Sequence, residues 1–148
     1  MSPQARKRIV ALMKGHALMR LATVRPDGYP QVTTVTYANE GLNIYFCCDA
    51  TSQKVRNLAR NRKVSLAIDR DFKRWDRIRG LSLGGSARRV SSRAEFARAL
   101  ALLQRKFPQL RGMSDADLEG LAIVKVAPKV VSMLDYTKGF GHTDFYRL

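Results

Sequence analysis

The residues with the clearest chemical potential form the segment Thr51-Ser52-Gln53-Lys54. This segment opens a stretch, 53–60, that is predicted to be helical, and the first N–H groups of a helix have no acceptor inside it. Those N–H groups, a hydroxyl and the Lys54 ammonium together suit the oxygens of a phosphate monoester. The structural alternative is that Thr51 or Ser52 only caps the helix while Lys54 lies in solvent. The motif alone leaves both interpretations open.

A strand rich in hydroxyl side chains precedes this segment. It is predicted over 31–38, after a turn in which Asp27-Gly28 tolerates positive φ, and its β-branched residues favour a pleated strand. A phosphate held at the helix start would leave a ring system lying along the strand, where backbone groups and short hydroxyls can hydrogen-bond a polar heterocycle. The residues expected beside such a ring are Thr33, Thr34, Val35 and Thr36.

Other residues of reactive type have simpler explanations. Cys47 and Cys48 are neighbours in a predicted strand and point to opposite faces, which argues against a structural disulfide or a metal cluster. Strand cysteines usually pack as small hydrophobes. His142 lies in a glycine-rich tail and is expected to be structural or at the surface rather than an acid or base over a bound ring. Trp75 stands among charged residues, where it would stack on a ring or lie at a subunit interface.

The elements that position these residues belong to one domain, 1–148. A chain of 148 residues can bury one core unaided. A first helix is predicted over 2–15 with Ser2 as its cap, and Ser92 with Glu95 forms a capping box that opens a later helix. Six or seven short strands linked by hairpins predict a mainly β protein, an antiparallel barrel with helices in its connections. Two of these strands are predicted over 122–127 and 130–134, and 135–148 is expected to be a tail.

The charge is strongly basic: 27 Lys and Arg stand against 12 Asp and Glu, a net charge of +15. Nucleic acid, a phosphorylated cofactor or simple counterions would each balance it. The basic residues are scattered, and the aromatic residues fall mainly at strand and core positions, so nucleic acid is the least favoured partner. No apolar run approaches the ~18 to 20 residues that span a bilayer. Residues 1–15 lack the apolar core of a signal peptide, so no membrane contact and a cytoplasmic location are expected.

Five segments form an ordered set within the stretch from about residue 17 to residue 107. They are Gly28-Tyr29-Pro30 with the strand after it, Tyr45-Phe46-Cys47-Cys48, and the stretches 51–58, 61–66 and 84–90. In this order they resemble the flavin-binding split barrels related to pyridoxamine 5′-phosphate oxidase. The resemblance implies an antiparallel split barrel of the FMN-binding type and a homodimer with FMN at each end of the subunit interface.

The same resemblance implies roles for individual residues. Ser52 and Lys54 would hold the FMN phosphate, with Gln53 between them, and the isoalloxazine would lie along Thr33, Thr34, Val35 and Thr36. Contacts from Cys47 or Cys48 and from Arg79 would also follow.

The chain departs from the oxidase pattern in three places. Thr33 stands where the oxidase has an arginine, and Gln53 replaces an arginine beside the phosphate lysine. The segment 135–148 lacks the tryptophan, arginine and histidine of the oxidase's C-terminal segment. These departures predict a smaller relative with a different small-molecule substrate rather than a vitamin B6 oxidase.

The leading hypothesis is therefore an FMN-dependent oxidoreductase in which the cofactor supplies the redox chemistry. A variant uses a deazaflavin cofactor with a polyglutamate tail, for which the landing surface would be Arg56, Arg60, Arg62, Lys63 and Arg74. A hypothesis from another class is a non-enzymatic module, either a flavin-binding sensor or a basic nucleic-acid binder.

Overall fold

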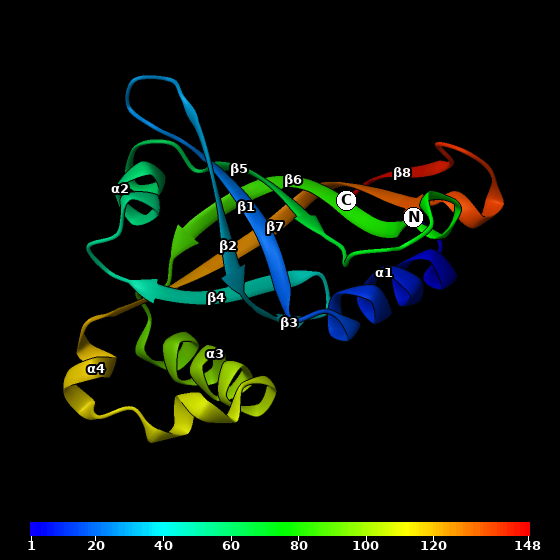
Figure 1. The fold of residues 1–148 in the computed structure, drawn as a ribbon. Helices are drawn as coiled ribbons and strands as arrows, with labels where there is room; N and C mark the ends of the chain where they lie inside the picture. The colour runs from blue at the N-terminus through cyan, green and yellow to red at the C-terminus, as the bar shows by residue number, and fades with distance from the viewer.

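The computed structural model describes residues 1–148 and contains one antiparallel sheet that curls into a split barrel (Figure 1). Its strand order is β2-β1-β5-β6-β7-β4-β3, and β8 pairs with β7. The strands are β1 Leu18–Val24, β2 Pro30–Thr36, β3 Ala38–Glu40, β4 Asn43–Asp49, β5 Lys63–Ile68, β6 Arg79–Arg89, β7 Leu121–Asp135 and β8 Thr143–Arg147. The mainly β, antiparallel split barrel that the sequence predicts is confirmed.

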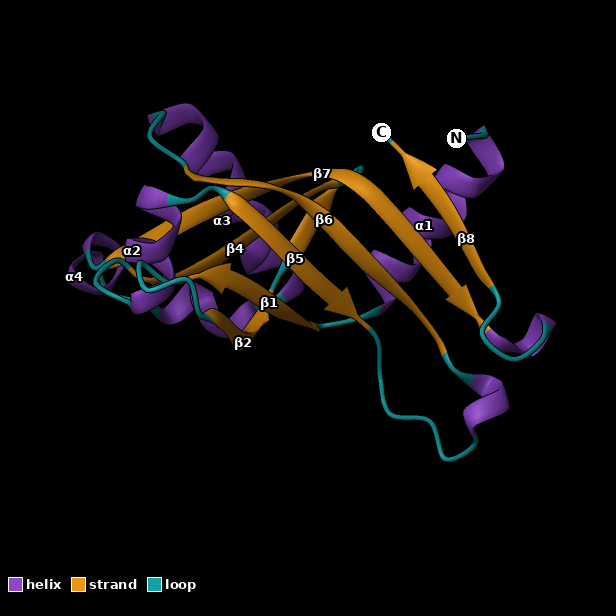
Figure 2. Cartoon of the chain, turned by 90° about the horizontal axis from the view of Figure 1, so that it is seen from above, coloured by secondary structure: helices purple, strands orange, loops and turns teal.

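The α-helices are α1 Pro3–Gly15, α2 Gln53–Arg60, α3 Arg93–Lys106 and α4 Asp115–Glu119. The last three lie in connections between strands, as expected, and α1 precedes the first strand. Figures 1 and 2 show α2 at one end of the sheet, and α1 and β8 at the other end, where both termini lie. None of these helices is long and apolar enough to cross a lipid bilayer.

Two details of the sheet differ from the sequence prediction. The two strands predicted over 122–127 and 130–134 are one strand, β7, whose register with β6 shifts where Gly85 faces Pro128. Glycine is required at position 85 because a Cβ there would overlap the Ala127 carbonyl. The predicted tail instead turns back and pairs with β7 as β8, so the short edge strand β3 and this C-terminal strand bring the sheet to eight strands.

The core fills the inside of the barrel and is closed by α1. Ile9 and Met13 of α1 are fully buried among residues of β1, β4, β5, β6 and β7. A second apolar cluster, which includes Tyr45, Leu103 and Ile123, lies between α3 and the outer face of β4 and β7. β4 is therefore buried on both faces, by the barrel core on one side and by α3 on the other.

Both ends of α1 are satisfied by side chains. Ser2 accepts a hydrogen bond from the Ala5 N–H at 3.2 Å, which confirms the predicted cap. At the other end Lys106 Nζ of α3 donates to the His16 carbonyl at 2.6 Å and lies 4.1 Å from the centroid of the Tyr37 ring. Burial lowers the pKa of Lys106. The Lys106 ammonium thus supplies a hydrogen-bond donor to a carbonyl at the end of α1, and this bond connects α1 to α3.

The capping box predicted for α3 is only half formed. Ser92 accepts from the Glu95 N–H at 3.4 Å. The Glu95 carboxylate does not return to the cap but pairs with Arg88 of β6 at 2.8 Å and with Lys125 of β7 at 3.5 Å. The helix start is thereby anchored to the sheet, because two cations on neighbouring strands compete successfully for the carboxylate.

The carboxylate of Asp135 joins three elements at the α1 end of the barrel. It lies 3.2 Å from Arg79 Nε of β6 and 3.6 Å from Arg8 Nη2 of α1, and it accepts the Thr137 hydroxyl. The Thr137 hydrogen bond, followed by the charge of Arg79, holds the pKa of Asp135 below its usual range. The side chain is 11% exposed, so these contacts are shielded from solvent.

Replacing Asp135 with Asn should lower the free energy of unfolding at pH 7 by about 1 to 3 kcal/mol, because a buried charged hydrogen bond is lost. A carboxyl whose folded pKa is lowered stabilises the fold above its unfolded pKa, near 3.9, and loses that contribution as pH falls through the folded pKa. The difference between the two proteins should therefore shrink below about pH 4. Urea unfolding at pH 7 and pH 3 measures it.

Asp69→Asn is the control, because Asp69 pairs with Arg20 at 2.8 Å on the surface, with side chains 49% and 38% exposed. Exposed pairs contribute about 0 to 1 kcal/mol. Equal losses for the two variants, or an Asp135→Asn loss that does not change with pH, would contradict the assignment.

Candidate cofactor-binding site

The first turn of α2 has hydrogen-bond donors that the chain does not use. Ser52 occupies the cap position, but its hydroxyl makes no capping bond and points instead to Cys48 Sγ at 3.7 Å. The main-chain N–H groups of Gln53 and Lys54 have no acceptor in the chain. Lys54 is half-buried and has no acidic partner. Two backbone donors, a hydroxyl and an ammonium group thus converge at one helix start, as a phosphate group requires.

Thr51 is occupied elsewhere. Its N–H and its hydroxyl both donate to Asp49 at 2.6 Å, and these bonds lower the pKa of the Asp49 carboxyl. Arg56 Nη1 donates to the Thr51 carbonyl at 2.6 Å. Of the two hydroxyls that the sequence places before the helix, only Ser52 is therefore available to a ligand.

The buried side-chain amide of Asn57 attaches α2 to the barrel. Asn57 is fully buried, and its Nδ2 donates to Thr23 Oγ1 of β1 at 2.9 Å and to Gln31 Oε1 of β2 at 3.0 Å. Its Oδ1 accepts from Gln53 Nε2 at 2.8 Å, and Gln53 Oε1 in turn accepts from Arg56. Gln53, predicted to contact the cofactor, thus uses its side chain inside the protein and offers only its N–H. Sequence reasoning missed Asn57, because one amide in an otherwise ordinary amphipathic helix carries no signal.

The two adjacent cysteines lie in different environments. Cys48 packs against the main core and lies beside Ser52, whereas Cys47 packs against the cluster beneath α3. Burial raises the pKa of both thiols. Of the pair, the structure therefore brings only Cys48 to the start of α2, and its raised pKa keeps it from adding a negative charge there.

The predicted ring-contacting residues divide between the two faces of β2. Thr33 and Val35 lie on the face that carries Gln31, half-buried and buried respectively, whereas Thr34 and Thr36 are exposed on the opposite face. The strand pairs only with β1. Its other edge therefore has backbone N–H and C=O groups that can bond a ligand or a second chain.

The surroundings of α2 are positively charged. A cavity of about 370 Å³ between α2 and the end of β6 is lined by three arginines, Arg62, Arg88 and Arg89, and by no acidic residue. Arg88 is paired with Glu95, and the other two have no ion pair. The positive electrostatic potential of these arginines favours an anionic group at the start of α2.

Arg79 does not lie near the start of α2. It begins β6 at the α1 end of the barrel, where it pairs with Asp135, whereas β6 reaches α2 only at its other end, about 30 Å away for a strand of 11 residues. Trp75 and His142 also lie away from α2: Trp75 packs edge-on against Phe140, and His142 lies 3.4 Å from Asp144 in the turn before β8. Within one chain, Arg79 is thus distant from the predicted site residues at the start of α2.

Comparison with known proteins agrees with the fold. Conserved hypothetical protein Rv2991 from Mycobacterium tuberculosis is 26% identical, with a TM-score of 0.80, over 97% of this chain and 91% of that one. A heme binding protein from Mycobacterium smegmatis is 21% identical with a TM-score of 0.82, over 99% of this chain and 59% of that one. HutZ, a heme storage protein from Vibrio cholerae, is 20% identical with a TM-score of 0.70, over 82% and 88% of the two chains.

No curated protein sequence matches the chain significantly. The family model described as pyridoxamine 5′-phosphate oxidase matches residues 5–135, from α1 to the end of β7. This range contains α2, the strands β1 and β2 on which it sits, and Arg79. The chain therefore belongs to the pyridoxamine 5′-phosphate oxidase family.

Proposed function

We propose that the protein is an FMN-binding oxidoreductase of this family that acts on a small-molecule substrate. The observation that carries the proposal is the start of α2, where the Gln53 and Lys54 N–H groups have no acceptor in the chain and the Lys54 ammonium makes no ion pair. The Ser52 hydroxyl there makes only a long contact with Cys48 Sγ, at 3.7 Å. FMN has the phosphate monoester that such a group of donors fits.

The rest of the molecule has groups suited to the other parts of this cofactor. β2, held to α2 through Gln31 and Asn57, offers unpaired backbone groups and threonine hydroxyls to a polar ring. When bound, the flavin would supply hydride and electron transfer, and the chain would orient it and limit its contact with water. No constellation of side chains in the α2 region provides an alternative nucleophile or acid-base pair.

A second copy of the chain completes the proposed site. Tyr29 and Val32, at the start of β2 and on its outer face, are 71% and 64% exposed, and the free edge of β2 continues this surface. Exposed apolar residues beside an unpaired strand edge are typical of an interface. In such a homodimer Arg79 would reach a cofactor only from the partner.

This arrangement predicts a dimer at micromolar concentration by light scattering. Val32→Lys should shift the protein toward monomer, because it places a charge in the apolar interface, and should weaken FMN binding in parallel. Thr143→Lys on β8 is a control at the other end of the molecule. A monomeric chain that binds FMN tightly would contradict an interfacial site.

The deazaflavin variant remains the second candidate, because a strongly basic cavity adjoins α2. Arg60, Arg62, Lys63 and Lys129 line a space of about 580 Å³ that has no acidic residue, and a polyglutamate tail would fit its charge. Two other members of the predicted landing surface are engaged elsewhere, since Arg74 pairs with Asp76 and Arg56 binds Thr51 and Gln53.

Replacing Lys54 with Ala should weaken FMN binding by about 1.5 to 3 kcal/mol, the range for a hydrogen bond to a charged group. Lys63→Ala removes the same charge from the basic cavity and should change FMN affinity little. Flavin fluorescence titration measures both. Equal losses would show that only the overall charge matters, and a Lys63→Ala effect confined to a polyglutamylated deazaflavin would favour the second candidate.

Serine variants supply the matched test of the helix start. Because Ser52 does not cap α2, Ser52→Ala should weaken FMN binding and leave the free energy of unfolding unchanged. Ser92 does cap α3, so Ser92→Ala should cost about 1 kcal/mol of stability and leave FMN affinity unchanged. A loss of stability without loss of affinity for Ser52→Ala would reduce Ser52 to a structural cap.

A further inference from the structure

Two turns at the α1 end of the barrel bring exposed aromatic side chains together. They are the 3₁₀ turns Trp75–Arg77, before β6, and Tyr136–Lys138, between β7 and β8. The Trp75 and Phe140 rings meet edge-on with centroids 5.3 Å apart, and the Phe140 and Tyr136 centroids are 5.7 Å apart. Trp75 and Phe140 are 60% and 81% exposed. We call Trp75, Tyr136 and Phe140 the aromatic patch.

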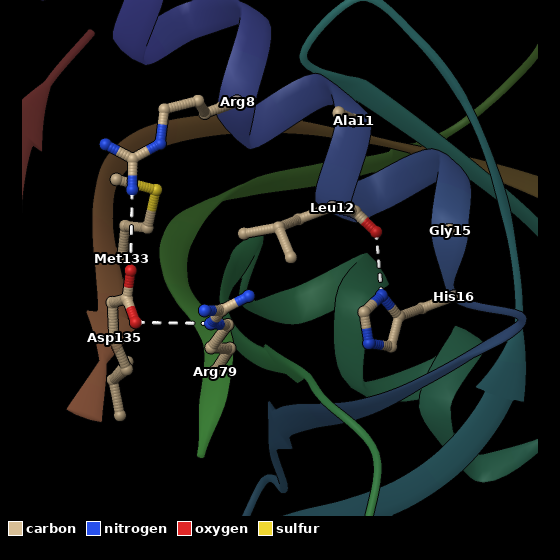
Figure 3. Close-up of a pocket in the computed structure, with 9 residues that line it drawn as sticks. Arg8, Ala11, Leu12, Gly15, His16, Arg79, Met133 and Asp135 are labelled. Carbon is tan, nitrogen blue, oxygen red and sulfur yellow. Dashed lines mark hydrogen bonds and ion pairs between the residues drawn. The ribbon is translucent and has the colours of Figure 1, made fainter. Parts of the chain in front are cut away.

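The aromatic patch is held next to Arg79 by hydrogen bonds. The Tyr136 N–H donates to the carbonyl of Ile78, the residue before Arg79, at 3.0 Å. Arg79 Nη2 donates to the Thr137 hydroxyl at 3.3 Å, and Arg79 Nε pairs with Asp135 (Figure 3). Arg79 Nη1 has no partner in the chain. A ligand that Arg79 reaches therefore also lies close to the aromatic patch.

The exposure of the patch is matched by exposed apolar residues at the other end of the molecule. Trp75 and Phe140 are left open at the α1 end, and Tyr29 and Val32 are left open at the start of β2, to which α2 is attached. Groups of exposed large apolar side chains are typical of binding surfaces. A twofold dimer makes each contact twice, so the α1 end of each chain can cover the α2 end of the other. Only such a pairing brings Arg79 to the partner's cofactor.

We propose that in the homodimer the Trp75 indole packs against the flavin ring held by the partner subunit, beside Arg79. This inference rests on the proposed function. Indole and isoalloxazine are both flat aromatic systems, and such pairs gain free energy beyond the area that they bury. Phe140 restrains the Trp75 ring and leaves much of it exposed. One chain thus holds the phosphate, and the other supplies an aromatic wall for the ring.

Trp75 is the only tryptophan, so Trp75→Leu removes all indole from the protein. FMN bound to the unsubstituted protein should be weakly fluorescent, because an indole in contact with a flavin quenches its emission. In Trp75→Leu the emission of bound FMN should recover, and FMN affinity should fall about two- to tenfold. Phe145→Leu is the matched control, because Phe145 of β8 is also 60% exposed and lies outside the aromatic patch. It should change neither quantity.

A mixed dimer tests whether Trp75 acts across the interface. Chains with Trp75→Leu and chains with Lys54→Ala are co-expressed with different affinity tags and purified through both tags. If Trp75 reaches the partner's flavin, one site of the mixed dimer contains neither substitution and the other contains both. The first site should bind FMN as tightly as the unsubstituted protein and quench its emission, which neither variant does alone.

The outcomes separate this inference from the proposed function. Emission and affinity of bound FMN that do not respond to Trp75→Leu, an equal response to Phe145→Leu, or a mixed dimer without a restored site would overturn the inference and leave FMN binding in place. No binding of FMN to the unsubstituted protein would overturn the proposed function, and this inference with it. If Trp75→Leu does not fold, Phe140→Leu replaces it. That variant keeps the indole but removes the ring that restrains it, so bound FMN should recover part of its emission.

Discussion

The donors at the first turn of α2 are the feature on which the proposed function depends. Each of the other three α-helices begins at a serine whose hydroxyl accepts a main-chain N–H: Ser2 for α1, Ser92 for α3 and Ser114 for α4. Ser52 occupies the same position in α2 and does not cap. Helix starts need acceptors, and here the chain provides none for two N–H groups while placing Lys54 beside them. An anion from outside the chain would supply what is missing.

The barrel fixes this helix start without using its donors. Asn57 and Gln53 connect α2 to β1 and β2 from the buried side. These side-chain contacts hold the first turn in place and leave its main-chain N–H groups available to a ligand. The opposite end of the barrel is held by charge, through Lys106 on the end of α1 and Asp135 between Arg8 and Arg79. The two ends are therefore separate chemical environments joined by the long strands β6 and β7.

Local signals in the sequence predicted the parts of the fold that local physics determines. Three such signals are Ser2 at the cap of α1, Asp27-Gly28 in the turn before β2, and the β-branched residues that follow this turn. The same signals predicted that Cys47 and Cys48 point apart and placed Ser52 and Lys54 at a helix start. They wrongly predicted that the Glu95 carboxylate would complete the capping box of α3. Its competing partners, Arg88 and Lys125, are distant in sequence. The local signals also missed β8, since pairing with β7 is what makes a glycine-rich tail into a strand.

The candidate site was predictable only in part, for the same reason. The spacing from Ser52 to Lys54 is local, whereas the 11 residues of β6 separate Arg79 from α2 in a way that only the register of the sheet reveals. The structural roles of Asn57 and His16 depend on the residues that they contact, and nothing around them in the sequence indicates those contacts.

A titration that compares FMN with riboflavin tests the central claim most directly, because the two ligands differ only in the phosphate. Hemin belongs in the same experiment, since two structural relatives are named for heme. A phosphate held at the start of α2 predicts that FMN binds at least tenfold more tightly than riboflavin, and that Ser52→Ala combined with Lys54→Ala removes the difference. Equal affinity for FMN and riboflavin, or binding of hemin with no binding of FMN, would contradict this account.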